Sequence, residues 1–211
     1  MKAFKLLVTK KITGSLLLRA GLKGIDILEK EFIRIQPVVS DTLKKTIASL
    51  ATSKHTVAFT SKNSVSAVIA NENVKGAEWK IYCLDGATRE EIRKHWSDER
   101  IAGTAQNASG LVTEIKNAAA GEKIIFFCGN LRRDDLPGLL RDDGFDVEEV
   151  VVYETILSPE TIIDDYDGVA FFSPSAVKSF FSKNILKKGT VCFSVGRTTT
   201  AALKEITTER I

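Results

Sequence analysis

The sequence has no long apolar run, and this shortage argues against a membrane-spanning protein. No apolar stretch approaches the roughly 20 residues that a spanning helix needs. The first residues, MKAFKLLVTKK, carry charges on both sides of a very short apolar run. This pattern favours a first strand over a secretory signal peptide, which has a longer apolar core. We therefore expect a cytoplasmic protein without a membrane partner.

Cysteine and histidine are also scarce, and neither forms a recognised metal or redox pattern. The three cysteines, Cys83, Cys128 and Cys192, each lie in an apolar run, and no two of them form a CxxC pair. We interpret them as buried, reduced thiols that act as small hydrophobic side chains. The two histidines, His55 and His95, form no HExxH motif. A metal site is therefore not expected.

Two further absences narrow the function. The chain contains no GxxxxGK and no GxGxxG, the motifs of phosphate and dinucleotide binding. Its 30 basic and 27 acidic residues give a net charge of +3, which is too balanced to indicate a nucleic-acid partner. The length of 211 residues allows one large domain or two small ones.

What the chain does contain is a repeated unit. Residues 57–68 read VAFTSKNSVSAV, and residues 169–181 read VAFFSPSAVKSFF. Each copy has a short apolar run, a hydroxyl-rich turn and then apolar residues at helical spacing, which predicts a buried strand leading into a helix. In open α/β sheets such turns lie at the carboxyl ends of the strands, where ligands bind. Two copies therefore suggest two sheets.

Strands and helices are expected to alternate along the chain. The expected strands are residues 4–8, 32–39, 56–59, 79–84, 100–103, 123–128, 147–153, 169–172 and 191–195. The expected helices include residues 16–20, 62–70 and 176–181, one capped by Ser40, and one opened by a capping box of Thr88 and Glu91. This alternation predicts an α/β protein of two small domains, each a parallel sheet flanked by helices in a doubly wound, flavodoxin-like arrangement.

The repeat also predicts how the chain divides. The N-terminal strands resemble residues 124–128 and 147–156, so we assign them to the sheet of the C-terminal copy. The expected domain 1 is therefore discontinuous, residues 1–38 plus 156–211, and domain 2 is residues 39–155. Two short crossings would join the domains.

The two copies differ at their ends. The first copy passes through Glu99-Arg100-Ile101 into a further strand, and the second copy reaches Glu209-Arg210-Ile211, the last residues of the sequence. From this match we expect domain 1 to lack a final strand and helix that domain 2 has.

Five segments, in this order, carry a resemblance to a known family. They are FTSKNSV, YCLDGATREE, FFCGNLRRDDLPGLLRDDGFDVEEVVVYET, FFSPSAVKSF and SVGRTTTAAL. Together they resemble uroporphyrinogen-III synthase, and the resemblance extends over residues 4–211. No single segment is specific, because turns of the FTS type are common; the ordered set carries the resemblance.

The resemblance implies a fold and a reaction. It implies two α/β domains joined by a two-stranded linker, with the active site in a cleft between them. The implied enzyme is a hydro-lyase of tetrapyrrole and heme biosynthesis. It cyclises hydroxymethylbilane to uroporphyrinogen III, with inversion of ring D and loss of water, without a metal or organic cofactor. We expect a monomer that receives its substrate from hydroxymethylbilane synthase.

The chemistry asks for a proton donor to the leaving hydroxyl group. Tyr153, at the end of the VVVY run, matches the tyrosine of the family's VY motif, and we predict it as the catalytic donor. A phenol keeps its proton at neutral pH and can therefore donate it. The alternative is a structural tyrosine, packed at a crossing with its hydroxyl satisfied locally.

A substrate with eight carboxylates needs many hydrogen-bond donors and some positive charge. The strand-end turns supply both, and free N–H groups at helix N-termini add to them. The predicted substrate-binding residues are Thr60, Ser61, Lys62, Asn63, Gly86, Thr88, Gly129, Asn130, Arg132, Ser173, Pro174, Ser175, Gly196, Arg197, Thr198 and Thr199. Further basic candidates are Lys10, Lys11, Arg89 and Arg133. The competing explanations are helix capping for the hydroxyl residues and solvated loop charge for the basic ones.

Two other functions stay open at this point. A non-catalytic, two-lobed binding protein for an anionic small molecule would close on its ligand without turnover. A regulatory module would use the fold as an interaction platform and would expose an apolar patch.

Overall fold

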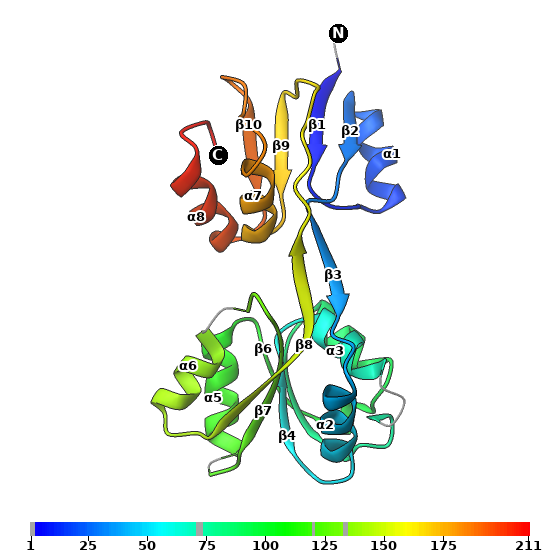
Figure 1. Cartoon of the computed structure of the whole chain (residues 1–211), viewed down its shortest axis with the longest axis vertical. Coiled ribbons are helices and arrows are strands. Elements are labelled where there is room, and N and C mark those ends of the chain that lie inside the picture. Colours follow the sequence, from blue (N-terminus) through cyan, green and yellow to red (C-terminus); the bar gives the residue numbers. More distant parts are fainter. Residues whose placement is uncertain (1–2, 71–73, 120, 133–134) are drawn as a thin grey trace. The chain divides into compact units, whose positions relative to one another are not determined.

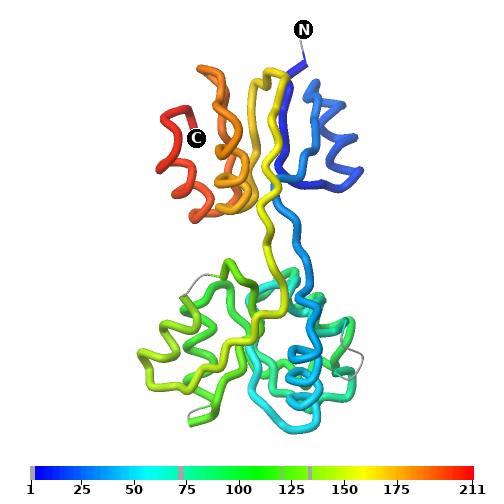
Figure 2. The backbone as a smooth tube through the Cα atoms, viewed as in Figure 1, coloured from blue at the N-terminus to red at the C-terminus, as the bar shows by residue number. Residues whose placement is uncertain are grey.

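The computed structural model describes residues 3–70, 74–119, 121–132 and 135–211. The chain forms two compact units (Figure 1). Unit 1 combines Met1–Arg34 with Thr155–Ile211, and unit 2 is Ile35–Glu154. The backbone tube in Figure 2 shows that the chain passes between the units twice. An α/β fold of parallel sheets flanked by helices is thus confirmed.

Unit 1 is built on a parallel sheet in the order β10-β9-β1-β2. Its elements are β1 (Phe4–Val8), α1 (Gly14–Leu22), β2 (Ile25–Glu29), β9 (Gly168–Phe171), α7 (Pro174–Phe181), β10 (Val191–Ser194) and α8 (Arg197–Ile206). The core packs one face of this sheet against α7 and α8, through residues such as Leu7, Val169, Val177 and Leu203.

Unit 2 contains a longer sheet in the order β3-β8-β7-β4-β5-β6. Its elements are α2 (Asp41–Ala51), β4 (Thr56–Phe59), α3 (Lys62–Ile69), β5 (Lys80–Leu84), α4 (Ala87–Arg93), a 3-10 turn (Asp98–Arg100), β6 (Ile101–Ala105), α5 (Ala108–Ala118), β7 (Ile124–Gly129) and α6 (Asp135–Asp142). Val57 and Ala58 are neighbours in β4, so their side chains point to opposite faces of the sheet. Val57 belongs to one core and Ala58 to another, so the sheet has a core on each face. One core includes α3 and the other includes α5 and α6.

Two strands contain the points at which the chain passes from one unit to the other. They are β3 (Ile33–Pro37) and β8 (Val147–Leu157). The Val38 N–H donates to the Val152 carbonyl at 3.0 Å, and the Ser158 N–H donates to the Phe32 carbonyl at 2.9 Å. These pairs make the two strands antiparallel, as their arrows in Figure 1 also show.

Equivalent strands pair in the same register in the two sheets. In unit 2, Ala58 lies opposite Tyr82 on one side and Phe126 on the other. In unit 1, Ala170 lies opposite Phe193 and Val8 in the same way. The repeated sequence therefore produces a repeated strand pairing: β4, β5 and β7 correspond to β9, β10 and β1.

The structure corrects two assignments around the first crossing. Strand β2 (Ile25–Glu29) was not expected, yet it pairs with β1 in parallel, and its alternating exposure is that of an edge strand. The strand expected at residues 32–39 is shorter, Ile33–Pro37. It neighbours β8 and does not join the sheet of the C-terminal copy.

The capping box of Thr88 and Glu91 is also wrong. Helix α4 begins at Ala87, so its N-cap is Gly86, which has no side chain to accept a bond and takes φ 77°. Thr88 lies inside the first turn and is buried. The positive φ of Gly86 starts the helix two positions earlier than the hydroxyl pattern indicated.

All three cysteines are unpaired and buried, and burial raises the pKa of each thiol to about 11. Such thiols stay protonated at neutral pH and are poor nucleophiles.

Within the described ranges, no helix is long and apolar enough to cross a membrane.

Candidate functional site

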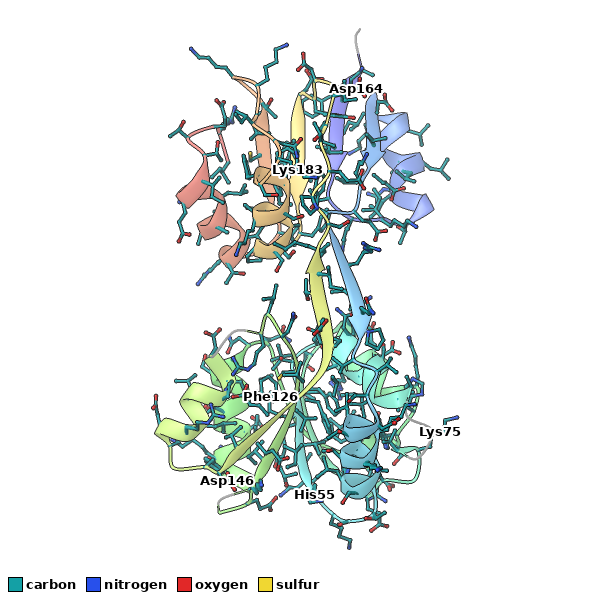
Figure 3. The ribbon with its side chains drawn as sticks, viewed as in Figure 1. His55, Lys75, Phe126, Asp146, Asp164 and Lys183 are labelled. Atoms are coloured by element: carbon teal, nitrogen blue, oxygen red, sulfur yellow. The ribbon has the colours of Figure 1, made fainter. Side chains whose placement is uncertain are left out.

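Most predicted site residues of unit 2 lie at one edge of its sheet. Strands β8, β7, β4, β5 and β6 are parallel, so their carboxyl ends meet at the same edge. The turns after β4, β5 and β7 supply Thr60, Gly86 and Asn130 there. His55 and Asp146 precede strands and lie at the opposite edge, as their labels in Figure 3 show.

The repeated turn forms an N-cap in both units. Ser61 Oγ accepts from the Asn63 N–H at 3.1 Å, and Ser173 Oγ accepts from the Ala176 N–H at 3.1 Å. Pro174 occupies the first turn of α7, where its missing N–H costs nothing. Capping thus explains both serines, and it leaves the remaining free N–H groups of α3 and α7 directed at the strand-end edge.

The glycine turns differ from the serine turns. Gly86 and Gly196 are the N-caps of α4 and α8, with φ 77° and 89°, and neither helix has a side-chain cap. Thr199 and Thr88 are buried, at 1% and 6% exposure, whereas Arg197 and Thr198 are exposed.

The loop after β7 is tied to β8. The Asn130 N–H donates to the Tyr153 carbonyl at 3.1 Å, and Arg132 Nε donates to Glu149 on β8. Glu149 also accepts from Arg141 Nη2 at 2.7 Å. Burial raises the pKa of Glu149, whereas the hydrogen bonds from the two guanidinium groups lower it. Together the two guanidinium groups outweigh burial, so the pKa lies below its ordinary value.

Unit 1 has a glutamate at the equivalent register. Glu149 lies opposite Phe126, and Glu29 of β2 lies opposite Val8. Glu29 Oε1 accepts from the Ile12 N–H, in the loop after β1, at 2.5 Å. In each unit, a glutamate on the strand paired with β7 or β1 therefore anchors the loop that follows β7 or β1. Neither glutamate was predicted from the sequence; the one signal was Glu149 inside the expected strand of residues 147–153.

The basic candidates have local partners in several cases. Lys10 Nζ lies 4.3 Å from the centroid of the Phe172 ring. Lys11 pairs with Glu31 at 3.9 Å, and Arg89 pairs with Asp85 at 3.3 Å. Lys62 and Arg197 are exposed. Arg133 lies outside the described residues.

Tyr153 lies on β8 opposite Gly129, the last residue of β7. Its partly buried ring packs against the core that contains Val65 and Phe127. The ring also covers Gly129: a Cβ built on that glycine would lie 2.8 Å from the Tyr153 hydroxyl oxygen. The predicted donor thus stands at the same strand-end edge as the predicted binding turns of unit 2.

The structure brings the predicted residues together within each unit. Unit 2 holds Thr60, Ser61, Lys62, Asn63, Gly86, Thr88, Gly129, Asn130, Arg132 and Tyr153, and unit 1 holds Ser173, Pro174, Ser175, Gly196, Arg197, Thr198 and Thr199, each set at the carboxyl ends of its strands. Helix N-termini, hydroxyl groups and guanidinium groups favour carboxylate ligands. No metal-binding group of histidine, cysteine, aspartate or glutamate occurs among the residues that the structure describes.

Comparison with known proteins decides the family. The family model described as uroporphyrinogen-III synthase HemD matches residues 18–211. The chain belongs to the uroporphyrinogen-III synthase family. The resemblance that the ordered segments indicated is thereby confirmed.

Solved structures of uroporphyrinogen-III synthases show the same fold. A mutant enzyme from Thermus thermophilus has a TM-score of 0.70 at 13% identity, with 99% of this chain and 91% of that chain covered. The enzyme from Helicobacter pylori has a TM-score of 0.68 at 16% identity, with 98% and 91% covered. At such low identity the likeness concerns the fold, and the family model carries the assignment.

Proposed function

We propose that this chain is a hydro-lyase that converts hydroxymethylbilane to uroporphyrinogen III without a metal or organic cofactor. The single observation that carries the proposal is the family match over residues 18–211. The donor-rich strand ends of both units support it, because the substrate is a flexible chain with eight carboxylates. Nothing in the comparisons favours the alternative of a non-catalytic binding protein.

Carboxylate binding is assigned to the strand-end turns. The exposed Lys62 and Arg197 stand at the first turns of α3 and α8, where free backbone N–H groups add to their charge. Lys10 would act from the loop after β1, beside the ring of Phe172. Several such contacts would fold the linear tetrapyrrole so that the unrearranged closure becomes slower.

Tyr153 is assigned as the proton donor. In this proposal its hydroxyl proton passes to the leaving hydroxyl group of the substrate, which departs as water and leaves an electrophilic azafulvene cation, protonated on the pyrrole nitrogen, beside the tyrosinate. Ring closure through a spiro intermediate inverts ring D. The proton that the ring system then releases restores the phenol. The remaining task of the protein is to hold the chain in the conformation that leads to the type III isomer.

A coupled assay tests the reaction. Hydroxymethylbilane is generated in place and incubated with the full chain, and the products are oxidised so that their isomers can be separated. Type III porphyrin above the spontaneous type I background is the expected result. Type I alone, under conditions in which a known family member yields type III, would contradict the proposal.

The role of Tyr153 is tested by Tyr153→Phe, which removes only the hydroxyl group. We expect kcat to fall by about 100- to 10,000-fold, the usual contribution of a positioned acid, with KM little changed. Tyr166→Phe in unit 1 is the matched control, since Tyr166 is also partly buried and lies outside the predicted site. A Tyr153→Phe variant with unchanged kcat would assign the tyrosine to the structure alone.

A further inference from the structure

Gly129 is a glycine for a steric reason. It is buried at the end of β7, and its φ is outside the left-handed region, so its backbone conformation is open to other residues. A Cβ at this position would lie 2.4 Å from Cζ, 2.6 Å from Cε2 and 2.8 Å from the hydroxyl oxygen of Tyr153. All three distances are shorter than van der Waals contact. The Tyr153 ring thus occupies the space that any other side chain at residue 129 would need.

The backbone holds the two residues in this arrangement. Gly129 and Tyr153 are register partners across β7 and β8, just beyond an irregularity at Cys128 and Gly129. The Asn130 N–H donates to the Tyr153 carbonyl at 3.1 Å, which fixes the loop after Gly129 against the same residue. The pairing of β7 with β8 therefore fixes how far the Tyr153 ring lies from the Gly129 backbone.

Two other glycines, Gly103 and Gly168, also lie beside aromatic rings. A Cβ on Gly103 would lie 2.8 Å from the ring of Tyr82, and one on Gly168 would lie 2.9 Å from the ring of Phe193. In both cases the atoms that lie within 3 Å of the added Cβ are ring carbons. At Gly129 the hydroxyl oxygen of Tyr153 is also within 3 Å of the added Cβ, whereas at Gly103 only carbons of the Tyr82 ring are that close.

We propose that Gly129 is a positioning residue that sets the height and direction of the Tyr153 hydroxyl group at the strand-end edge. This inference rests on the proposed function, because it assigns Gly129 a role through the proton donor. Gly129 was predicted to bind substrate directly. Its burial and the ring above it favour action through Tyr153.

The test is Gly129→Ala, assayed for kcat, KM and isomer ratio. We expect kcat to fall at least about tenfold, which corresponds to a loss of about 1.4 kcal/mol in transition-state stabilisation, with KM changed less than twofold. The type I fraction should rise as the spontaneous closure competes. In the Tyr153→Phe background, Gly129→Ala should have little further effect on kcat, because both changes act on the same hydroxyl group.

Gly103→Ala is the matched control, since it forces a similar clash with the Tyr82 ring in the same unit. It should lower stability while leaving the isomer ratio of the folded protein unchanged. A kcat for Gly129→Ala equal to that of Gly103→Ala would overturn the proposal. So would full additivity of Gly129→Ala with Tyr153→Phe.

A measurement on the unaltered chain covers the case in which Gly129→Ala does not fold. The ring above Gly129 should displace the NMR signals of the Gly129 α-protons upfield, and Tyr153→Leu should remove this displacement. If the displacement is absent, the Tyr153 ring does not lie over Gly129 and the proposal fails. If the displacement is present but no type III isomer forms, the proposed function fails although the ring lies over Gly129. The two failures are therefore distinguishable.

Discussion

The two units place equivalent aromatic residues in opposite environments. Tyr82 of unit 2 and Phe193 of unit 1 occupy the same register position, each beside an alanine of the central strand. Tyr82 is fully buried, whereas Phe193 is 47% exposed. In unit 2 that face of the sheet packs against α5 and α6. In the described part of unit 1, the core takes its helical residues from α7 and α8, on the opposite face.

This difference separates what a strand sequence specifies from what its neighbours add. Both strands present an aromatic ring to the same side of the sheet, because strand alternation and pairing are repeated. Whether the ring is buried depends on a helix elsewhere in the chain. The hydrophobic contribution of the two rings to stability should therefore differ, although their local sequences are alike.

The largest predicted effect is that of Tyr82→Ala. Removing a fully buried aromatic side chain should lower the free energy of unfolding by about 3–5 kcal/mol. Urea unfolding followed by tryptophan fluorescence measures this in unit 2, because both tryptophans, Trp79 and Trp96, lie there. Phe193→Ala, followed by hydrogen exchange of β9 and β10, should cost about 1 kcal/mol or less. Equal losses would show that Phe193 is buried in solution.

The next effect concerns the two anchoring glutamates. The folded-state pKa of Glu149 is below its ordinary value of 4.5, so its contribution to stability is present above that value and is lost as the pH falls through the folded pKa. Glu149→Gln should lower stability at pH 7 by about 1–2 kcal/mol, discounted for the exposure of Arg141, and should flatten the loss of stability below pH 4.5.

Glu29→Gln is the matched variant for Glu149→Gln. Glu29 accepts from a backbone N–H, whereas Glu149 accepts from two guanidinium groups. Because Glu29 belongs to unit 1, its replacement should leave the unfolding of unit 2 unaffected. The pH dependence of unfolding, measured by tryptophan fluorescence, distinguishes them. An unchanged acid profile in Glu149→Gln would mean that the two arginines do not hold this carboxylate in solution.

The smallest predicted effect is that of the repeated caps. Ser61→Ala and Ser173→Ala should each cost about 1 kcal/mol, because each serine accepts one N–H bond at the start of a helix. Hydrogen exchange of α3 and α7 would measure each loss in its own unit. A loss in one variant only would show that the repeat is closer in sequence than in energetics.

The fold followed from local patterns wherever a strand was buried. The runs at residues 57–59 and 124–128 are apolar throughout, and they lie in β4 and β7. Strand β2 was missed because its residues alternate between half-buried and exposed, as expected for an edge strand. The Thr88 capping box failed because a glycine with positive φ took the cap.

The candidate site was predicted at the level of turns. Parallel strands bring their carboxyl ends to one edge, so the turn residues of each unit gather there as the pattern indicated. The individual roles of these residues stay predictions, including that of Tyr153. The anchoring of the β7 loop by Glu149 could not be seen in the sequence, because it depends on which face of β8 the side chain occupies.

The sequence by itself determined the repeated strand–turn–helix units, the parallel sheets and the family, because these follow from apolar periodicity and an ordered set of segments. The tertiary structure alone decided that Phe193 is exposed where Tyr82 is buried, and that the Tyr153 ring rests on Gly129. The physical reason is that these contacts join residues of different elements. Burial and steric fit are properties of packed surfaces, and a linear pattern does not contain them.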